Sequence, residues 1–446
     1  MIKPKSYHAG LFLLFFFPGI LAALEGTLEY RSYEGRPEIH LPWTSPEIEF
    51  KLKPPDDVKV KFPETVSEHP VYARLQLGET QRILLFDYEK KDDGFYKLLY
   101  FDQNANNDLT DDPAIKAQSF SNGGGPYGMR YAGFENIKTT YKIGDTTLPY
   151  LLSINARWFV PSLGRTVYDP SDIVNRMTVS FSPKCYYEGQ FKDYQFVLTD
   201  FNGNGYFSET LTRKKDYDPE EDSNEYDADV FVLRKDKKYT WSDEQWITGY
   251  MELAGVLYEF KPDITKGKIV VEPYSGDLTP VTFSMKTERT TLYNSSGKGS
   301  ICFYGTGEEA TVPAGRYNLV DYCVFKKDEK GALWLLQCNA TRESPVYFIN
   351  GSSKTDIAFG EPFIPYAKVP KWSLEHFLEK NDVKYVNLSL GVEGKAREEL
   401  LTISKISGDE TAIPMSSRSK TLPKEPTITV SDKTGEIVFQ GAFEYG

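Results

Sequence analysis

Short runs of alternating or β-branched residues recur along the chain, and turn residues separate them. This period of two is typical of strands buried on one face, and it leaves little room for helices. The one short candidate helix covers residues 373–380, with Ser373 as its N-cap. We therefore predict a mostly β protein with under a fifth of its residues in helices. Clear examples of the strand pattern are residues 71–77, 82–88, 96–101, 194–199 and 316–325.

Turn-rich seams predict how these strands are grouped. The stretch 276–280 ends a first large region, and the stretch 360–370, which contains three prolines, separates two smaller units. At roughly 150 residues per domain, the length suits about three domains. We predict a large N-terminal β domain over residues 24–280, followed by small β-sandwich modules over residues 281–362 and 363–446.

The N-terminus has the parts of an export signal. Lys3 and Lys5 are followed by an apolar run at 11–17 and by the small residues Ala22 and Ala23. A membrane span needs roughly 20 apolar residues, and this run is shorter. We predict a signal peptide over residues 1–23, with an uncleaved anchor as the alternative. The expected location is secreted, periplasmic or in the cell envelope.

The net charge and the absence of common catalytic motifs reduce the classes of function that we expect. The formal net charge is −12, and an acidic surface repels nucleic acid and attracts cations. The sequence has no G-x-S-x-G, H-E-x-x-H or Walker motif. We expect no nucleic-acid partner, and a non-catalytic protein more than an enzyme. A carbohydrate-active hydrolase remains the alternative, because such an enzyme needs only two carboxylates and the chain has 64 Asp and Glu residues.

The four cysteines lack the close spacing of a zinc site. They are Cys185, Cys302, Cys323 and Cys338. Cys323 and Cys338 flank a turn almost symmetrically. If Lys330 and Gly331 form a two-residue hairpin loop, these two cysteines face each other and a disulfide is predicted. A slip of one residue in register would place them on opposite faces.

Two strand-loop segments echo each other. In both, a Tyr lies six residues before an Asp, an apolar strand runs between them, and the pattern D-x-N-x-N follows. We call residues 102–112 the first loop and residues 200–209 the second loop. In the first loop the relevant residues are Asp102, Asn104, Asn106, Asn107, Asp108 and Leu109; in the second they are Asp200, Asn202, Asn204, Gly205, Tyr206 and Phe207.

This spacing suits calcium. Ca²⁺ takes six to eight oxygen ligands at about 2.3–2.6 Å. Side chains at positions one, three and five converge when the chain curls, position six turns with positive φ, and position eight packs inward. Position seven, Asp108 or Tyr206, offers its backbone carbonyl. Further acids are needed, from Asp111 or Asp112 in the first loop and from Glu209, Asp227 or Asp229 in the second.

Ordinary turns are the alternative reading, because Asp and Asn are common at hairpin tips. The predicted ligands are nonetheless Asp102, Asn104, Asn106, Asp108 and Asp112 in the first loop and Asp200, Asn202, Asn204, Tyr206 and Asp229 in the second.

These residues resemble the calcium loops of the EF-hand superfamily, including the shorter loops of exported bacterial proteins. The resemblance covers about 12 residues in each copy. Pro113 and Leu211 stand where the family has a bidentate acid, and each loop follows a strand instead of a helix. The calcium-sensor mechanism is therefore not implied. The whole chain resembles exported bacterial β-rich proteins that combine such loops with small β-sandwich modules, a likeness that implies no activity.

Together these features predict an exported, calcium-stabilised, non-catalytic protein with a structural or binding role. The expected cofactor is Ca²⁺. The expected partner is a carbohydrate or another envelope protein.

Overall fold

The described chain is almost entirely β-structure. Strands hold 59% of the described residues and helices 1%, which confirms the mostly β prediction. Within the described part, no helix has the length and apolar character needed to cross a membrane. The predicted helix at 373–380 and the predicted signal peptide lie outside the described residues. The computed structural model describes residues 24–33, 48–90, 95–122, 129–159, 174–191, 193–214, 226–234, 244–253, 255–296, 299–305, 308–351, 353–369, 388–408, 411–416, 419 and 421–443.

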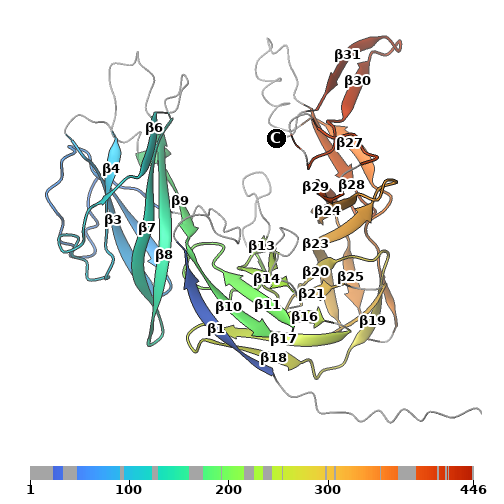
Figure 1. The fold of residues 1–446 in the computed structure, drawn as a ribbon, viewed down its shortest axis with the longest axis horizontal. Coiled ribbons are helices and arrows are strands. Elements are labelled where there is room, and N and C mark those ends of the chain that lie inside the picture. Colours follow the sequence, from blue (N-terminus) through green and yellow to red (C-terminus); the bar gives the residue numbers. More distant parts are fainter. Residues whose placement is uncertain are drawn as a thin grey trace, which may run out of the picture.

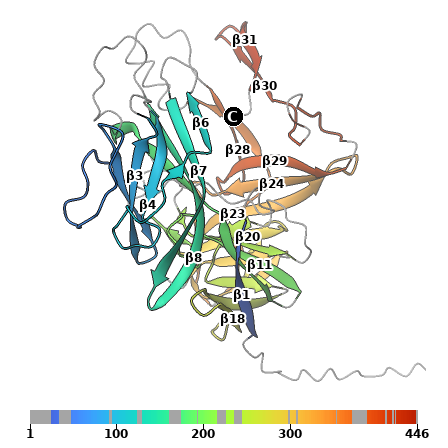
Figure 2. The ribbon, with the colours of Figure 1, turned by 60° about the vertical axis from the view of Figure 1, so that its left-hand side comes forward.

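The first part of the chain forms a sandwich of two four-stranded antiparallel sheets (Figures 1 and 2). Aromatic rings from the two sheets meet in its core: Phe86 lies 6.0 Å from Phe134, and Tyr96 lies 5.3 Å from Trp158, between ring centroids. One sheet contains β2 (Val71–Leu77), β3 (Thr80–Tyr88), β4 (Tyr96–Phe101) and β5 (Ile115–Lys116); the other contains β6 (Ser119–Asn122), β7 (Met129–Ile143), β8 (Thr146–Phe159) and β9 (Thr178–Pro183).

A 16-stranded sheet carries the rest of the molecule, in the order β15-β14-β11-β10-β1-β18-β17-β16-β21-β20-β23-β24-β29-β28-β27, with β25 paired to β23. Its strands before residue 280 are β1 (Leu24–Ser32), β10 (Cys185–Phe191), β11 (Tyr194–Thr199), β14 (Val230–Arg234), β15 (Glu244–Trp246), β16 (Tyr250–Leu253), β17 (Val256–Asp263) and β18 (Lys268–Pro273). Its later strands are β20 (Arg289–Asn294), β21 (Ile301–Tyr304), β23 (Gly315–Lys327), β24 (Leu333–Asn339), β25 (Val346–Ile349), β27 (Ile364–Lys368), β28 (Ser389–Glu393) and β29 (Glu399–Ser407).

Three small sheets complete the described fold. They are β12 (Thr212–Arg213) with β13 (Tyr226–Asp227), then β22 (Glu309–Val312), β19 (Thr279–Phe283) and β26 (Thr355–Ile357), and finally β30 (Thr427–Ser431) with β31 (Ile437–Ala442).

Strand pairing crosses both predicted domain boundaries. β16 pairs in parallel with β21 across residue 280, and β24 pairs with β29 across residue 362. One hydrophobic core cluster joins the sandwich to the central strands between Leu28 and Val271, and a second lies between Leu257 and Ala396. The grouping into three units therefore stays a prediction. The sandwich and the strands β1, β10, β11 and β14 share the first of these cores, and the second loop lies between them.

The predicted disulfide between Cys323 and Cys338 is wrong. All four cysteines are free and buried. In the pairing of β23 with β24, Cys323 lies opposite Gln337 and Cys338 lies opposite Tyr322, so the two thiols project from opposite faces. The cause is the turn: Lys327 pairs with Leu333, which leaves five residues in the loop where two were assumed.

Candidate metal centre

Each loop leaves its strand with the backbone geometry that the sequence predicts. At position six, φ is 63° for Asn107 and 89° for Gly205. At position eight, Leu109 and Phe207 are fully buried. These expectations are confirmed, and they show that the two segments are the same local structure.

A second left-handed residue in each loop was not foreseen. Position four has φ of 59° at Ala105 and 73° at Gly203. Two left-handed residues curl the backbone tightly enough for its N–H groups to turn toward the first Asp of the loop. Sequence gave no signal for this at Ala105, because alanine rarely adopts that conformation.

The first Asp of each loop lies buried at the centre of the curl. Asp200 accepts hydrogen bonds from the backbone N–H groups of Gly203 at 2.7 Å, Asn204 at 3.1 Å and Gly205 at 2.7 Å. Asp102 accepts the corresponding bonds from Asn106 and Asn107, both at 3.2 Å. The second loop is therefore the tighter of the two around its first carboxylate.

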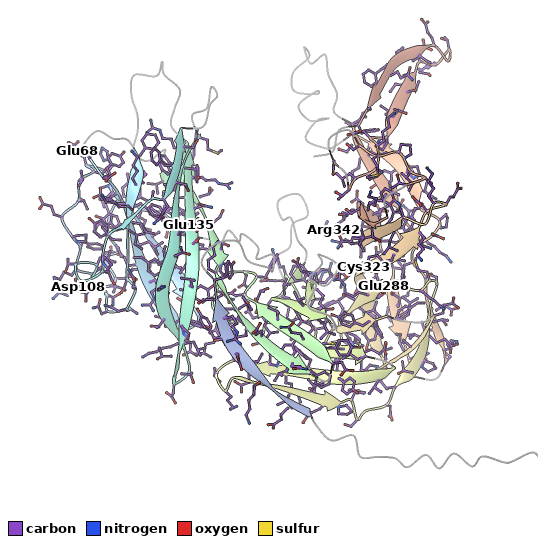
Figure 3. The ribbon with its side chains drawn as sticks, viewed as in Figure 1. Glu68, Asp108, Glu135, Glu288, Cys323 and Arg342 are labelled. Atoms are coloured by element: carbon purple, nitrogen blue, oxygen red, sulfur yellow. The ribbon has the colours of Figure 1, made fainter. Side chains whose placement is uncertain are left out.

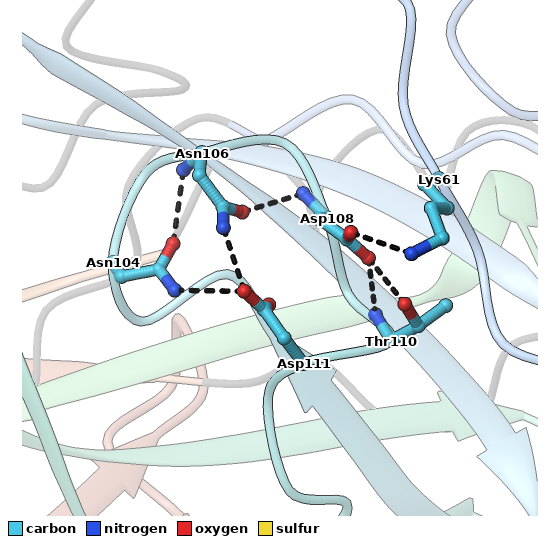
Figure 4. A network of polar contacts seen from close by, with 6 residues as sticks. All are labelled: Lys61, Asn104, Asn106, Asp108, Thr110 and Asp111. Atoms are coloured by element: carbon cyan, nitrogen blue, oxygen red, sulfur yellow. Dashed lines mark hydrogen bonds and ion pairs between the residues drawn. The ribbon is translucent and has the colours of Figure 1, made fainter.

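In each loop, one carboxylate oxygen of the acid at position ten accepts hydrogen bonds from the side-chain amides of both asparagines. In the second loop, Glu209 Oε2 accepts Nδ2 of Asn202 at 2.8 Å and Nδ2 of Asn204 at 2.7 Å. In the first loop, Asp111 takes the same part. Its Oδ2 accepts Nδ2 of Asn106 at 2.7 Å and of Asn104 at 3.4 Å (Figure 4). Positions three, five and ten thus converge in both copies.

A third acid closes each loop at its second residue. Asp112 Oδ2 accepts the N–H of Gln103 at 3.2 Å, and Asp229 Oδ1 accepts the N–H of Phe201 at 3.0 Å. Asp229 Oδ2 also accepts the N–H of Glu209 at 2.9 Å. Asp229 comes from the chain just before β14, so it was one of several candidates in the sequence and is the one that the fold brings to the loop. Asp227 instead pairs with Thr212 in the small sheet of β12 and β13.

The residues predicted to give carbonyl ligands occupy position seven as expected. The N–H of Tyr206 donates to Asn204 Oδ1 at 2.8 Å, and the N–H of Asp108 donates to Asn106 Oδ1 at 2.7 Å. The Asp108 carboxylate, at the outer side of the sandwich in Figure 3, faces Lys61 at 2.8 Å (Figure 4). It therefore lies outside the ring formed by positions three, five and ten.

Three carboxyl groups, those of Asp200, Glu209 and Asp229, meet at the second loop. Burial raises the pKa of Asp200, and burial followed by the neighbouring Asp200 carboxylate raises the pKa of Asp229 well above its usual value. Of the ion pairs between described residues, none involves Asp200, Glu209 or Asp229. A bound cation would relieve this repulsion.

Acid side chains alone do not make a metal cage here. Across the described ranges, no group of three or more His, Cys, Asp or Glu side chains is placed to hold an ion. A cation at either loop would depend on amide and backbone oxygens in addition to carboxylates. That mixture of ligands is the one Ca²⁺ accepts in flexible loops.

The second loop is also a joint between two parts of the fold. Tyr150, on β8 of the sandwich, donates its hydroxyl hydrogen to Asp200 Oδ2 at 2.6 Å. The N–H of Gly78, between β2 and β3, donates to the Asn204 carbonyl at 2.5 Å. The Phe207 ring lies 6.1 Å from that of Tyr150 and 5.0 Å from that of Tyr187 on β10. Sequence reasoning missed these contacts, because residues 78 and 150 are distant in the chain.

A charged groove tests the hydrolase alternative. It has a volume of about 400 Å³, and its lining includes Glu49, Asp57 and Tyr72. Arg74 donates from both terminal guanidinium nitrogens to the Asp57 carboxylate, from Nη1 at 2.8 Å, and this hydrogen bonding lowers the pKa of Asp57. Glu49 forms an ion pair with Lys51 at 3.0 Å. A general acid needs a raised pKa, so Asp57 is not suited to that role.

The two loops therefore repeat one arrangement of an Asp, two Asn and two further acids, and the second loop connects the sandwich to the central sheet. The carboxylate, amide and carbonyl oxygens of this arrangement are of the kind that a hard cation takes as ligands. In comparisons with known proteins, no family model, no curated protein and no solved structure matches the chain.

Proposed function

We propose that this chain is an exported, non-catalytic protein whose fold is stabilised by calcium at the second loop. The observation that supports it most is the convergence of Asn202, Asn204 and Glu209 beside the buried carboxylates of Asp200 and Asp229. The export part rests on the basic and apolar pattern of residues 1–23. The proposed kinship with exported bacterial β-rich proteins that carry EF-hand-like loops rests on the D-x-N-x-N pattern.

The proposed role of the ion is structural. The second loop touches the sandwich through Tyr150 and Gly78 and touches the central sheet through Tyr187 and Asp229. An ion that holds this loop in its curled form would hold both sets of contacts in place. The sandwich and the central strands would then act as one platform for a carbohydrate or envelope-protein partner in a cell envelope or extracellular setting.

We expect weak binding. The second loop lacks the bidentate acid at position twelve, and two of its ring ligands are neutral amides. Extracellular modules of this kind have dissociation constants of about 10⁻⁴–10⁻³ M. Such an affinity is sufficient outside the cytoplasm, where free calcium is plentiful.

Calcium is expected to raise the thermal stability of the purified protein. At a calcium concentration of ten to a hundred times the dissociation constant, mass action adds about 1.4–2.7 kcal/mol to the free energy of unfolding. For a chain of this size we expect a rise of a few degrees in melting temperature. Glu209→Gln removes the charge but keeps the shape and the hydrogen-bonding capacity of the side chain, so it should remove most of the rise. Melting curves in calcium and in chelator measure both.

Asp193→Asn is the matched control. Asp193 is an exposed acid in the turn before β11, outside the second loop, and its variant should keep the full calcium effect. Identical wild-type melting curves in calcium and in chelator would contradict the proposal and leave both loops as ordinary turns.

A further inference from the structure

Two positively charged side chains, Lys61 and Arg82, lie beside the first loop. Lys61 Nζ lies 2.8 Å from the Asp108 carboxylate, and the hydrogen bond from Lys61 lowers the pKa of Asp108 to about 2. The backbone of Lys61 fixes this pair, because its N–H donates to the Asn107 carbonyl and its carbonyl accepts the N–H of Leu109, both at 2.9 Å. Lys61 is therefore built into the exit of the loop.

A buried guanidinium lies behind the same loop. Arg82 on β3 is 1% exposed, and its Nη2 donates to the Thr140 carbonyl. The adjacent Thr139 holds the loop itself, because its hydroxyl donates to the Gln103 carbonyl at 2.7 Å. The Nε and Nη1 of Arg82 have no hydrogen-bond partner among the described residues.

The carboxylates of the first loop compensate the positive charge of the buried Arg82 guanidinium. Burial lowers the pKa of Arg82, and the nearby carboxylates of Asp102 and Asp112 offset part of that lowering. A charged group in the interior needs such compensation, since an isolated one is strongly disfavoured. Arg82 brings one positive charge to the inner side of the first loop, near Asp102 and Asp112, and Lys61 neutralises the extra carboxylate of Asp108 at its outer side.

The second loop differs at both places. Position seven is Tyr206, which carries no charge where the first loop has the Asp108–Lys61 pair. The group behind the first Asp is the neutral hydroxyl of Tyr150, 2.6 Å from Asp200. The two loops thus share one backbone conformation. Lys61 and Arg82 lie beside the first loop, and the neutral residues Tyr206 and Tyr150 take the corresponding places at the second.

We infer that Arg82 and Lys61 replace the metal ion in the first loop, so that the protein binds one calcium ion per chain, at the second loop. The inference rests on the proposed function for its second half and on Arg82 and Lys61 for its first half. The first loop is then a calcium-independent copy, and these two side chains are what exclude calcium from it. This departs from the pair of calcium loops that the sequence pattern predicts.

The test is the number of calcium ions bound per chain, measured by equilibrium dialysis and metal analysis at calcium up to about ten times the expected dissociation constant. We expect one ion for the wild type, one for Asp102→Asn and none for Asp200→Asn. Two ions for the wild type, or one ion that is lost in Asp102→Asn and kept in Asp200→Asn, would overturn the inference. These three proteins decide it without any change to the buried arginine.

Removal of the two cations should open the first loop to calcium. Arg82→Met combined with Lys61→Met leaves the carboxylates of Asp102, Asp111 and Asp112 in place, and we expect this variant to bind two ions. The control is Arg74→Met with Lys116→Met, which removes one Arg and one Lys from the same sheet and should stay at one ion. A folded Arg82 and Lys61 double variant that still binds one ion would contradict the inference.

The two claims fail differently. A wild type that binds no calcium overturns the proposed function. In that case the double variant should still bind one ion at the first loop, and its failure to do so, while folded by circular dichroism, would overturn the inference as well.

Discussion

Phe207→Ala is expected to lower the free energy of unfolding by about 3–5 kcal/mol. Phe207 is fully buried at position eight of the second loop. Its ring packs between Tyr150 of the sandwich and Tyr187 of the central sheet, with centroid separations of 6.1 and 5.0 Å. Loss of the ring leaves a cavity where three elements meet, and close-packed surroundings relax only in part around such a cavity. Urea unfolding followed by tryptophan fluorescence measures the effect.

The control for this prediction is Phe348→Ala. Phe348 on β25 is 68% exposed, so its removal should change the free energy of unfolding by less than about 1 kcal/mol. Equal effects for the two variants would mean that Phe207 does not anchor the joint.

Gly205→Ala is expected to destabilise the protein by about 2–4 kcal/mol. Gly205 has φ of 89°, a conformation that costs an L-residue about 1–2 kcal/mol. A Cβ atom there would also lie 2.9 Å from the backbone nitrogen of Gly78 and 3.1 Å from the Tyr141 ring. Because the nearest of these atoms belongs to the backbone, the turn between β2 and β3 would have to move away from the second loop. The same urea experiment reports this loss.

Gly255→Ala separates the two contributions. Gly255 has nearly the same φ, 83°, but a Cβ atom there would meet nothing within 4 Å. This variant should cost only the backbone part, about 1–2 kcal/mol. If Gly205→Ala costs no more than Gly255→Ala, the close approach of the second loop to Gly78 contributes nothing to stability.

The fold class could be predicted because strand patterning is local. Alternation along 71–77, 96–101 and 194–199 places the strands β2, β4 and β11 where the structure has them. Register could not be predicted in the same way. The turn after β23 has five residues where two were assumed, and the resulting register places Gln337 opposite Cys323, one residue away from Cys338, which therefore lies on the other face.

In the candidate site, too, the residues within one segment could be predicted and those brought in from distant segments could not. Positions one, three, five, six and eight of each loop could be predicted, because they depend on a spacing within one segment. The choice of Asp229 among the later acids could not, since it depends on where β14 brings the chain. The charged Arg82 beside the first loop and the neutral Tyr150 beside the second lie on β3 and β8, and no local sequence pattern points to them.

A crystal structure from a calcium-containing solution tests the central claim most directly. We expect electron density for one ion in the second loop, with oxygens of Asn202, Asn204 and Glu209 about 2.3–2.6 Å away and with a seventh-position carbonyl from Tyr206 among its ligands. The first loop should show no ion beside Lys61 and Arg82. A second loop with no ion at a calcium concentration well above about 10⁻³ M, with the Asn202 and Asn204 amides still bonded to Glu209, would contradict the account.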